Sequence, residues 1–220
     1  MPPQIGQFIS TAVYEDKLKS NPSHPIKDDV IACRFIDAKG GESRLGDSYQ
    51  VGKPYACFPL LTMVQNRMEC DVAMKLAVKL QELEKSYRII TPYTAQRQLI
   101  EDSMKQVPDL LWGDKCFSVD SFQGPSLSFL CMFLVLTLWK GNEDDYIIIS
   151  TVRSLQIGFL KNLRRTNVML TRCKKGMFII SSQKFLAGPG ACSLVGEMAK
   201  SAGAVAWLDV AEIEAGEFLT

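Results

Sequence analysis

The chain has 220 residues, of which 47% are hydrophobic and 22% charged, and its formal net charge is +1. This composition is typical of a globular protein, and the length suffices for one large α/β domain with its own core. Modules dedicated to nucleic acid are usually more basic, so any nucleic-acid contact must come from local clusters of charge.

Seven cysteines are scattered along the chain without a CxxC pair, and His24 is the only histidine. Zinc ligands usually come in closely spaced pairs, so we expect no metal site. Scattered cysteines in odd number are typical of reduced core thiols, which predicts a protein of the cytoplasm or nucleus. The first ten residues lack the basic and apolar segments of a signal peptide.

Turn residues mark the first 26 positions, which are polar and aromatic and end in the segment Asn-Pro-Ser-His-Pro at 21–25. We interpret residues 1–26 as a connector. The stretch from Val30 to Ile36 then predicts a strand, and the glycine-bearing stretch from Gly40 to Lys53 predicts a loop.

Helices and strands alternate over the rest of the chain. Apolar residues recur at helical spacing between Cys70 and Lys85, and a second helix opens at Thr91-Pro92-Tyr93. The β-branched run from Tyr146 to Thr151 suits a strand buried on both faces. The other predicted elements are strands at Tyr87–Ile90, Cys116–Val119 and Met177–Ser181 and helices at Leu163–Lys174 and Leu194–Ala202.

This alternation predicts an α/β fold in which a parallel sheet is covered by helices on both faces. Ligands of such sheets bind at the carboxyl ends of the strands. Three polar segments fall beside predicted strands, and we expect them at that edge. They are ITPYTAQR at 90–97, VDSFQG at 119–124 and RRTNVMLTR at 164–172.

In this order the three segments resemble the motifs of the second, C-terminal RecA-like domain of superfamily 1 helicases of the nonsense-mediated-decay type. The resemblance implies a RecA-like sheet and a function in an ATP-dependent motor that binds single-stranded RNA or DNA. It also implies a division of the chain into the end of an upstream motif with a connector (1–26), the second RecA-like domain (27–203) and a C-terminal tail (204–220).

The third segment places Arg172 eight residues after Arg164, about two helical turns further on. A guanidinium is always charged and grips phosphate through two parallel donors. The resemblance implies that Arg172 is a catalytic arginine finger on the γ-phosphate of ATP and that Arg165 also contacts the nucleotide. For Arg164 and Lys174 a solvated basic face is the better interpretation.

Short polar side chains surround Gly124 in the second segment, where glycine allows a sharp turn or a close ligand approach. The resemblance assigns Gln123 and Gly124 to the nucleotide site, and Asp120 and Ser121 to nucleic acid. A helix N-cap is an equally good interpretation of the Asp-Ser pair.

In the first segment, Thr91 ends a predicted strand, Pro92 starts a helix and Tyr93 supplies a ring for stacking or packing. The resemblance implies that these three residues contact the nucleic-acid backbone. Plain helix initiation explains Pro92 equally well.

Two parts of an ATPase are missing from the sequence: a GxxxxGK[ST] phosphate loop and a carboxylate pair for Mg²⁺. The resemblance assigns both, and most of the binding of ATP and Mg²⁺, to an upstream RecA-like partner domain. Residues 1–5 resemble the end of a family motif whose arginine would stand just before Met1. We therefore expect a truncated chain that does not hydrolyse ATP alone; the alternative is a non-catalytic binding scaffold.

Residues 125–141 do not fit the resemblance. Their removal would join Phe-Gln-Gly to Asn-Glu-Asp-Asp-Tyr, as in the family, so we interpret them as a translated intron or gene-model error, with a natural insertion as the alternative. Their apolar stretch is shorter than the roughly 20 residues of a membrane span, so we expect no membrane association. The resemblance implies that Glu143, which follows, contacts the ribose of the nucleotide.

Overall fold

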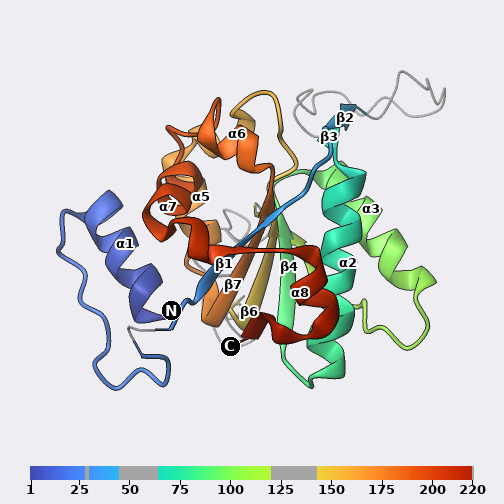
Figure 1. Ribbon diagram of the computed structural model, residues 1–220, viewed down its shortest axis with the longest axis horizontal. Helices are drawn as coiled ribbons and strands as arrows, with labels where there is room; N and C mark the ends of the chain where they lie inside the picture. Colours follow the sequence, from blue (N-terminus) through green and yellow to red (C-terminus); the bar gives the residue numbers. More distant parts are fainter. Residues whose placement is uncertain (28–29, 45–63, 120–142, 220) are drawn as a thin grey trace, which may run out of the picture.

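A six-stranded, all-parallel sheet forms the centre of the protein in the computed structural model, which describes residues 1–27, 30–44, 64–119 and 143–219 (Figure 1). The strand order is β5-β4-β6-β7-β1-β8. These strands are β1 (Cys33–Asp37), β4 (Tyr87–Thr91), β5 (Cys116–Ser118), β6 (Asp144–Ser150), β7 (Cys173–Ser181) and β8 (Trp207–Leu208). The predicted parallel sheet is confirmed, and all five predicted strands lie in it.

The strand β6 lies in the interior of the sheet, between β4 and β7. In register, Ile149 pairs with Ile90 on one side and with Ile179 on the other. All three are fully buried. The β-branched run therefore serves a strand that is covered on both faces, as predicted.

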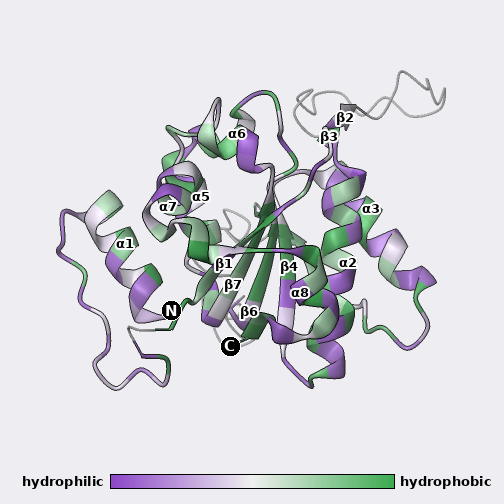
Figure 2. Ribbon diagram, in the orientation of Figure 1, coloured by the Kyte–Doolittle hydropathy of each residue, from purple (hydrophilic) through white to green (hydrophobic). Residues whose placement is uncertain are grey.

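Helices cover both faces of the sheet and enclose two apolar clusters (Figures 1 and 2). One face carries α2 (Arg67–Glu82), α3 (Thr94–Gln106) and α8 (Val210–Ala215); the other carries α1 (Pro3–Tyr14), α5 (Leu163–Leu170), α6 (Gln183–Ala187) and α7 (Leu194–Ala202). Apolar strands lie between these layers in Figure 2. This is the predicted RecA-like architecture.

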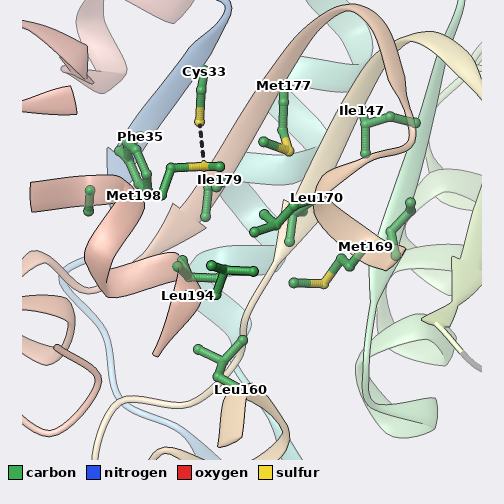
Figure 3. Close-up of a cluster of buried hydrophobic side chains, with 14 of the residues drawn as sticks. Cys33, Phe35, Ile147, Leu160, Met169, Leu170, Met177, Ile179, Leu194 and Met198 are labelled. Carbon is green, nitrogen blue, oxygen red and sulfur yellow. Dashed lines mark hydrogen bonds between the residues drawn. The ribbon is translucent and has the colours of Figure 1, made fainter. Parts of the chain in front are cut away.

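Figure 3 shows the apolar cluster on the face of α5 and α7. Met169 and Leu170 from α5 lie there with Leu194 and Met198 from α7. The buried thiol of Cys33 donates a hydrogen bond to the thioether of Met198 at 3.6 Å. Cys33, Cys70, Cys116 and Cys173 are buried in the core, whereas Cys192 is exposed.

A helix occupies most of the segment predicted as a connector. The helix α1 starts after Pro2, buries Ile5 and Ile9 on one face, and ends at Glu15 with a left-handed φ of 52°. The spacing of the two isoleucines by four residues is a helical signal, and the sequence analysis missed it. Residues 15–26, which follow α1, form neither a helix nor a strand.

The residues predicted as a C-terminal tail are folded over 204–219. They form the 3₁₀ turn η4 (Ala204–Ala206), the edge strand β8, the helix α8 and the 3₁₀ turn η5 (Glu217–Leu219). A capping box between Asp209 and Glu212 starts α8, and Phe218 packs edge-on against Phe178 at 5.4 Å. Elements of two to six residues are too short to show a periodicity.

The helix predicted over 163–174 ends at Leu170, and Cys173 to Lys175 belong to β7. Tertiary pairing explains the difference, because β6 offers Asp144 as the strand partner of Cys173. A short antiparallel pair, β2 (Ser43–Arg44) with β3 (Val64–Gln65), stands apart from the main sheet. Residues 125–141 lie outside the described residues.

Candidate functional site

The predicted site residues do not gather at one edge of the sheet. Thr91 ends β4 at the carboxyl edge, whereas Arg172 directly precedes β7 at the amino edge. From the register of β4, β6 and β7, the two residues are separated by about 25 Å along the strands. The expectation of one shared edge is therefore wrong for Arg172, because α5 runs back along the sheet before it releases this residue. Asp120, Ser121, Gln123 and Gly124 lie outside the described residues.

At the amino edge, Arg172 is half-buried and its Nε donates to the carbonyl oxygen of Val168 at 2.9 Å. Its own carbonyl accepts from the backbone N–H of Asp144 at 3.2 Å, which fixes Arg172 to the start of β6. The bond from Nε to Val168 is the only side-chain hydrogen bond that Arg172 makes to a described residue. The terminal guanidinium nitrogens are thus free of partners within the described part of the chain.

Glu143 lies beside this position. Burial raises the pKa of the Cys173 thiol to about 12; the amino group of Met1 lowers it and the carboxylate of Glu143 raises it. Both charges therefore act on the residue next to Arg172. In Figure 1 the N-terminus lies near the amino-terminal end of β1, and Gln4 accepts from the N–H of Ala32 there.

The other acidic residues of this edge have cationic partners. Asp144 pairs with Arg88 (3.4 Å between Nε and Oδ2), and Asp145 pairs with Lys175 (2.8 Å), a contact that raises the pKa of Lys175. The exposed Glu143 makes no ion pair with a described residue. Within the described part of the chain, Arg172 and Glu143 thus each present a charged group without an ionic partner at this edge.

Arg165 lies near the start of α5, whereas Arg172 follows the end of this helix. Its guanidinium stacks on the ring of Phe159 at 4.6 Å, and its backbone N–H donates to the N-cap Asn162. The two arginines are seven residues apart, which corresponds to about 10 Å along a helix. A ligand would have to lie along α5 to contact both.

At the carboxyl edge, Tyr93 is buried, and its Oη accepts from the N–H of Phe159 at 3.2 Å. Tyr93 is therefore a packing ring rather than an exposed stacking surface. Thr91 is also buried, whereas Pro92 is half-buried and Thr94 is exposed. The helix α3 begins at Thr94, and within the described part of the chain no side chain caps its first N–H groups.

Behind this edge lies a buried polar network that the sequence analysis missed. The carboxyl group of Glu69 accepts from Ser150 Oγ at 2.7 Å and from the N–H of Val152 at 2.8 Å. Burial raises the pKa of Glu69 to about 8, since desolvation outweighs these hydrogen bonds. The sequence signal for it is Asn66 three residues before Glu69 at the start of an apolar helix, a capping-box pattern.

Gln96 joins this network to α3. Its side-chain amide pairs with the backbone of Asn66, accepting from the N–H at 2.7 Å and donating to the carbonyl at 3.0 Å. It also donates to Ser150 Oγ at 3.1 Å. The residues Glu69, Gln96 and Ser150 are all fully buried and mutually satisfied.

The loop that follows β6 is held by an ion pair and an unusual backbone conformation. Val152 has φ 69°, and a β-branched residue in this region is a genuine outlier. The next residue, Arg153, is buried and pairs with Glu42 at 3.1 Å between Nε and Oε2. Glu42 in turn accepts from the N–H of Ser154 at 2.9 Å.

Within the described residues, no group of three His, Cys, Asp or Glu side chains is placed to hold a metal ion. Among the helices described, none has the length and apolar character needed to cross a membrane.

A family model described as "AAA domain" matches residues 1–184. Three similar curated proteins bear names of helicases or of nonsense-transcript regulators. The "Regulator of nonsense transcripts 1" of Dictyostelium discoideum is 31% identical over 208 residues, 85% of this chain and 13% of its own length. The "Putative ATP-dependent RNA helicase ECM32" of Saccharomyces cerevisiae is 27% identical over 228 residues, 84% of this chain and 19% of its own length. The "ATP-dependent helicase NAM7" of the same yeast is 38% identical over 106 residues, 45% of this chain and 9% of its own length. The chain thus spans less than a fifth of the length of each of these relatives.

Proposed function

This chain belongs to the superfamily 1 helicases of the nonsense-mediated-decay type over most of its length, and we propose that it is the second RecA-like motor domain of an ATP-dependent helicase. The observation that carries the proposal is the meeting of Arg172 and Glu143 at one edge of the sheet. A separate nucleic-acid surface lies at the opposite edge. A motor domain needs both surfaces, one for nucleotide and one for the strand.

The amino edge is half of a nucleotide site in this proposal. Arg172 acts as the arginine finger that stabilises charge on the γ-phosphate, and Glu143 contacts the ribose. The residues fit such a ligand, because neither the carboxylate of Glu143 nor the terminal nitrogens of Arg172 has a partner in the described part of the chain. Arg165, at the other end of α5, is a further proposed nucleotide contact, as are Gln123 and Gly124, which lie outside the described residues.

The phosphate cradle and the Mg²⁺ ligands belong to an upstream RecA-like partner domain in this proposal. The sequence has no phosphate-binding loop, so ATP is held mainly by that partner. When bound between the two domains, ATP supplies the free energy of translocation. The 220-residue chain alone is therefore expected to show no ATP hydrolysis above background.

The carboxyl edge is the proposed contact for a single strand of RNA or DNA. Uncapped N–H groups at the start of α3 suit a backbone phosphate, and Pro92 and Thr94 border them on the surface. Thr91, Asp120 and Ser121 complete the proposed set. Tyr93 supports the edge from below through its hydrogen bond to Phe159.

The proposed motor domain covers residues 27–203, preceded by residues 1–26, which contain α1, and extended by β8 and α8. Residues 125–141 remain a proposed insertion. The cytoplasm or the nucleus, where RNA and DNA are found, is the proposed location.

A charge placed at the start of α3 tests the strand contact. Thr94→Glu adds a negative charge where the phosphate would bind, although the same charge stabilises a helix N-terminus. We expect the affinity for a fluorescein-labelled 12-nucleotide oligouridylate to fall by tenfold or more, as measured by anisotropy on the 220-residue chain. Gln98→Glu is the matched control, because Gln98 is exposed one turn further along the same helix. Equal binding by both variants, or none by the wild-type chain, would refute the proposed strand contact.

A further inference from the structure

A single loop connects the two proposed surfaces. It starts where β6 ends at Ser150, passes through the 3₁₀ turn η3 (Gly158–Lys161) and ends at Asn162, the N-cap of α5. The helix α5 then leads to Arg172 at the amino edge. Anything that moves the loop 150–162 therefore acts on the segment that carries Arg172.

Val152 is the strained position of this loop. Its side chain is fully buried, and its φ of 69° is unfavourable for a β-branched residue. Both of its backbone polar groups are held by the first turn of α2: the N–H donates to Glu69 at 2.8 Å, and the carbonyl accepts from Asn66 Nδ2 at 3.3 Å. Surroundings that fix a residue in this way are what allow such a conformation to persist.

The first polar segment, 90–97, contacts the loop at both ends. At the beginning of the loop, Gln96 donates to Ser150 Oγ, and Ser150 donates to Glu69. Near the end of the loop, Tyr93 Oη accepts from the N–H of Phe159, and a Cβ added at Gly158 would lie 2.5 Å from that oxygen. Residues 90–97, the proposed nucleic-acid-binding segment, therefore pack closely against the loop at both of these points.

We propose that Glu69 is a positioning residue that holds Val152 in its strained conformation and so links the strand-binding segment to Arg172. The inference rests on the proposed function and adds a relay to it. In this relay, nucleic-acid binding at Thr91–Gln96 acts on the loop 150–162, and the loop acts through α5 on Arg172. Contacts through packed side chains and hydrogen bonds that have discrete arrangements can carry such coupling. Glu69 itself touches neither nucleotide nor strand in this account.

Three variants of the 220-residue chain separate the relay from general stability. Glu69→Met removes the acceptor for Val152 and Ser150 while filling similar volume. Glu69→Gln keeps an acceptor oxygen for both and is the conservative rescue. Leu80→Ala is the matched control, because Leu80 is equally buried on α2 but lies far from the network, near the end of the helix.

Amide hydrogen exchange with and without the 12-nucleotide oligouridylate measures the relay. In the wild-type chain, binding should slow exchange in the loop 152–162 and at residues 170–173. In Glu69→Met, the amides of Val152 and Phe159 should exchange at least tenfold faster without ligand, and the slowing at 170–173 should disappear, while the oligonucleotide affinity stays within threefold. Glu69→Gln and Leu80→Ala should keep the slowing.

Each outcome decides between the proposals. Wild-type exchange in Glu69→Met overturns the positioning role, and loss of the slowing in Leu80→Ala would reduce it to general stability. Binding without any effect at 170–173 in the wild type overturns the relay alone, whereas absence of binding overturns the proposed function together with the relay. If Glu69→Met does not fold, Ser150→Ala removes the link to Gln96 and leaves the Val152 bond intact, so it should abolish only the slowing at 170–173.

Discussion

The two edges of the sheet use polar residues in opposite ways. At the carboxyl edge, Glu69, Gln96 and Ser150 are fully buried and satisfy one another. At the amino edge, Glu143 and Arg172 are at least partly exposed, and their charged ends lack partners within the described chain. Polar groups that fix the fold are thus closed off from solvent, whereas those suited to a ligand are left open to it.

The largest expected difference between the two edges is in stability. Glu69→Ala leaves the N–H of Val152 and the hydroxyl of Ser150 buried without an acceptor, so the free energy of unfolding should fall by about 3 kcal/mol. Glu143→Ala at the exposed edge should change it by less than about 0.5 kcal/mol. Urea unfolding measures both. A similar cost for the two substitutions would remove the contrast.

Close packing of the loop against Tyr93 gives the next effect. Gly158→Ala forces a Cβ to within 2.5 Å of Tyr93 Oη at a φ of 51°, and should cost about 2 kcal/mol. Gly216→Ala is the control, because Gly216 also has a left-handed backbone conformation (φ 82°, ψ 11°) but nothing within 4 Å of an added Cβ. It should cost only the backbone strain, about 1 kcal/mol. In a Tyr93→Phe background, which lacks this oxygen, Gly158→Ala should lower the free energy of unfolding by less. An unchanged loss would show that it does not come from the contact with Tyr93 Oη.

The buried carboxyl group predicts a pH dependence. Because burial raises the pKa of Glu69 from its usual 4.5 to about 8, the folded state binds up to one more proton than the unfolded state between these two pH values. The stability from Glu69 is therefore full below the unfolded pKa and is lost as pH rises through this window, by about 1.4 kcal/mol per pH unit at most. Urea unfolding at pH 5 and pH 8 should show a smaller decline in Glu69→Gln. An equal decline in both proteins would rule out Glu69 as its source.

The smallest effect concerns the exposed pair at the amino edge. Asp145→Asn breaks the contact with Lys175, whose side chain is 43% exposed. Solvent screens such pairs, so the unfolding free energy should change by less than about 0.5 kcal/mol. A loss above 1 kcal/mol would show that the amino edge is also structural.

Strong local patterns in the sequence predicted the sheet. The run Ile147–Ile149 is apolar enough that only an interior strand could bury it, and it was placed correctly. The helix α1 was missed although Ile5 and Ile9 stand four residues apart, because the surrounding turn residues dominated the interpretation. Short elements such as β8 and α8 form only because the finished sheet offers them a partner.

The candidate site was predicted as a set of residues but not as an arrangement. Arg172 was expected beside Thr91, and the direction of α5 places the two at opposite edges. The network around Glu69 depends on contacts between positions far apart in the chain, such as Glu69 with Ser150, 81 residues later, which no local pattern reveals. Burial of Tyr93 likewise follows from the path of the loop after β6.

The most direct test of the proposed motor domain is the turnover of an Arg172 variant. A fusion that supplies an upstream RecA-like domain with a phosphate-binding loop provides the complete nucleotide site. In this protein, Arg172→Ala should lower the kcat of ATP hydrolysis by about 10³-fold or more, as expected for an arginine finger. Arg164→Ala, at an exposed position of the preceding helix α5, should leave kcat within twofold. Unchanged turnover in Arg172→Ala would contradict the assignment of the amino edge to ATP.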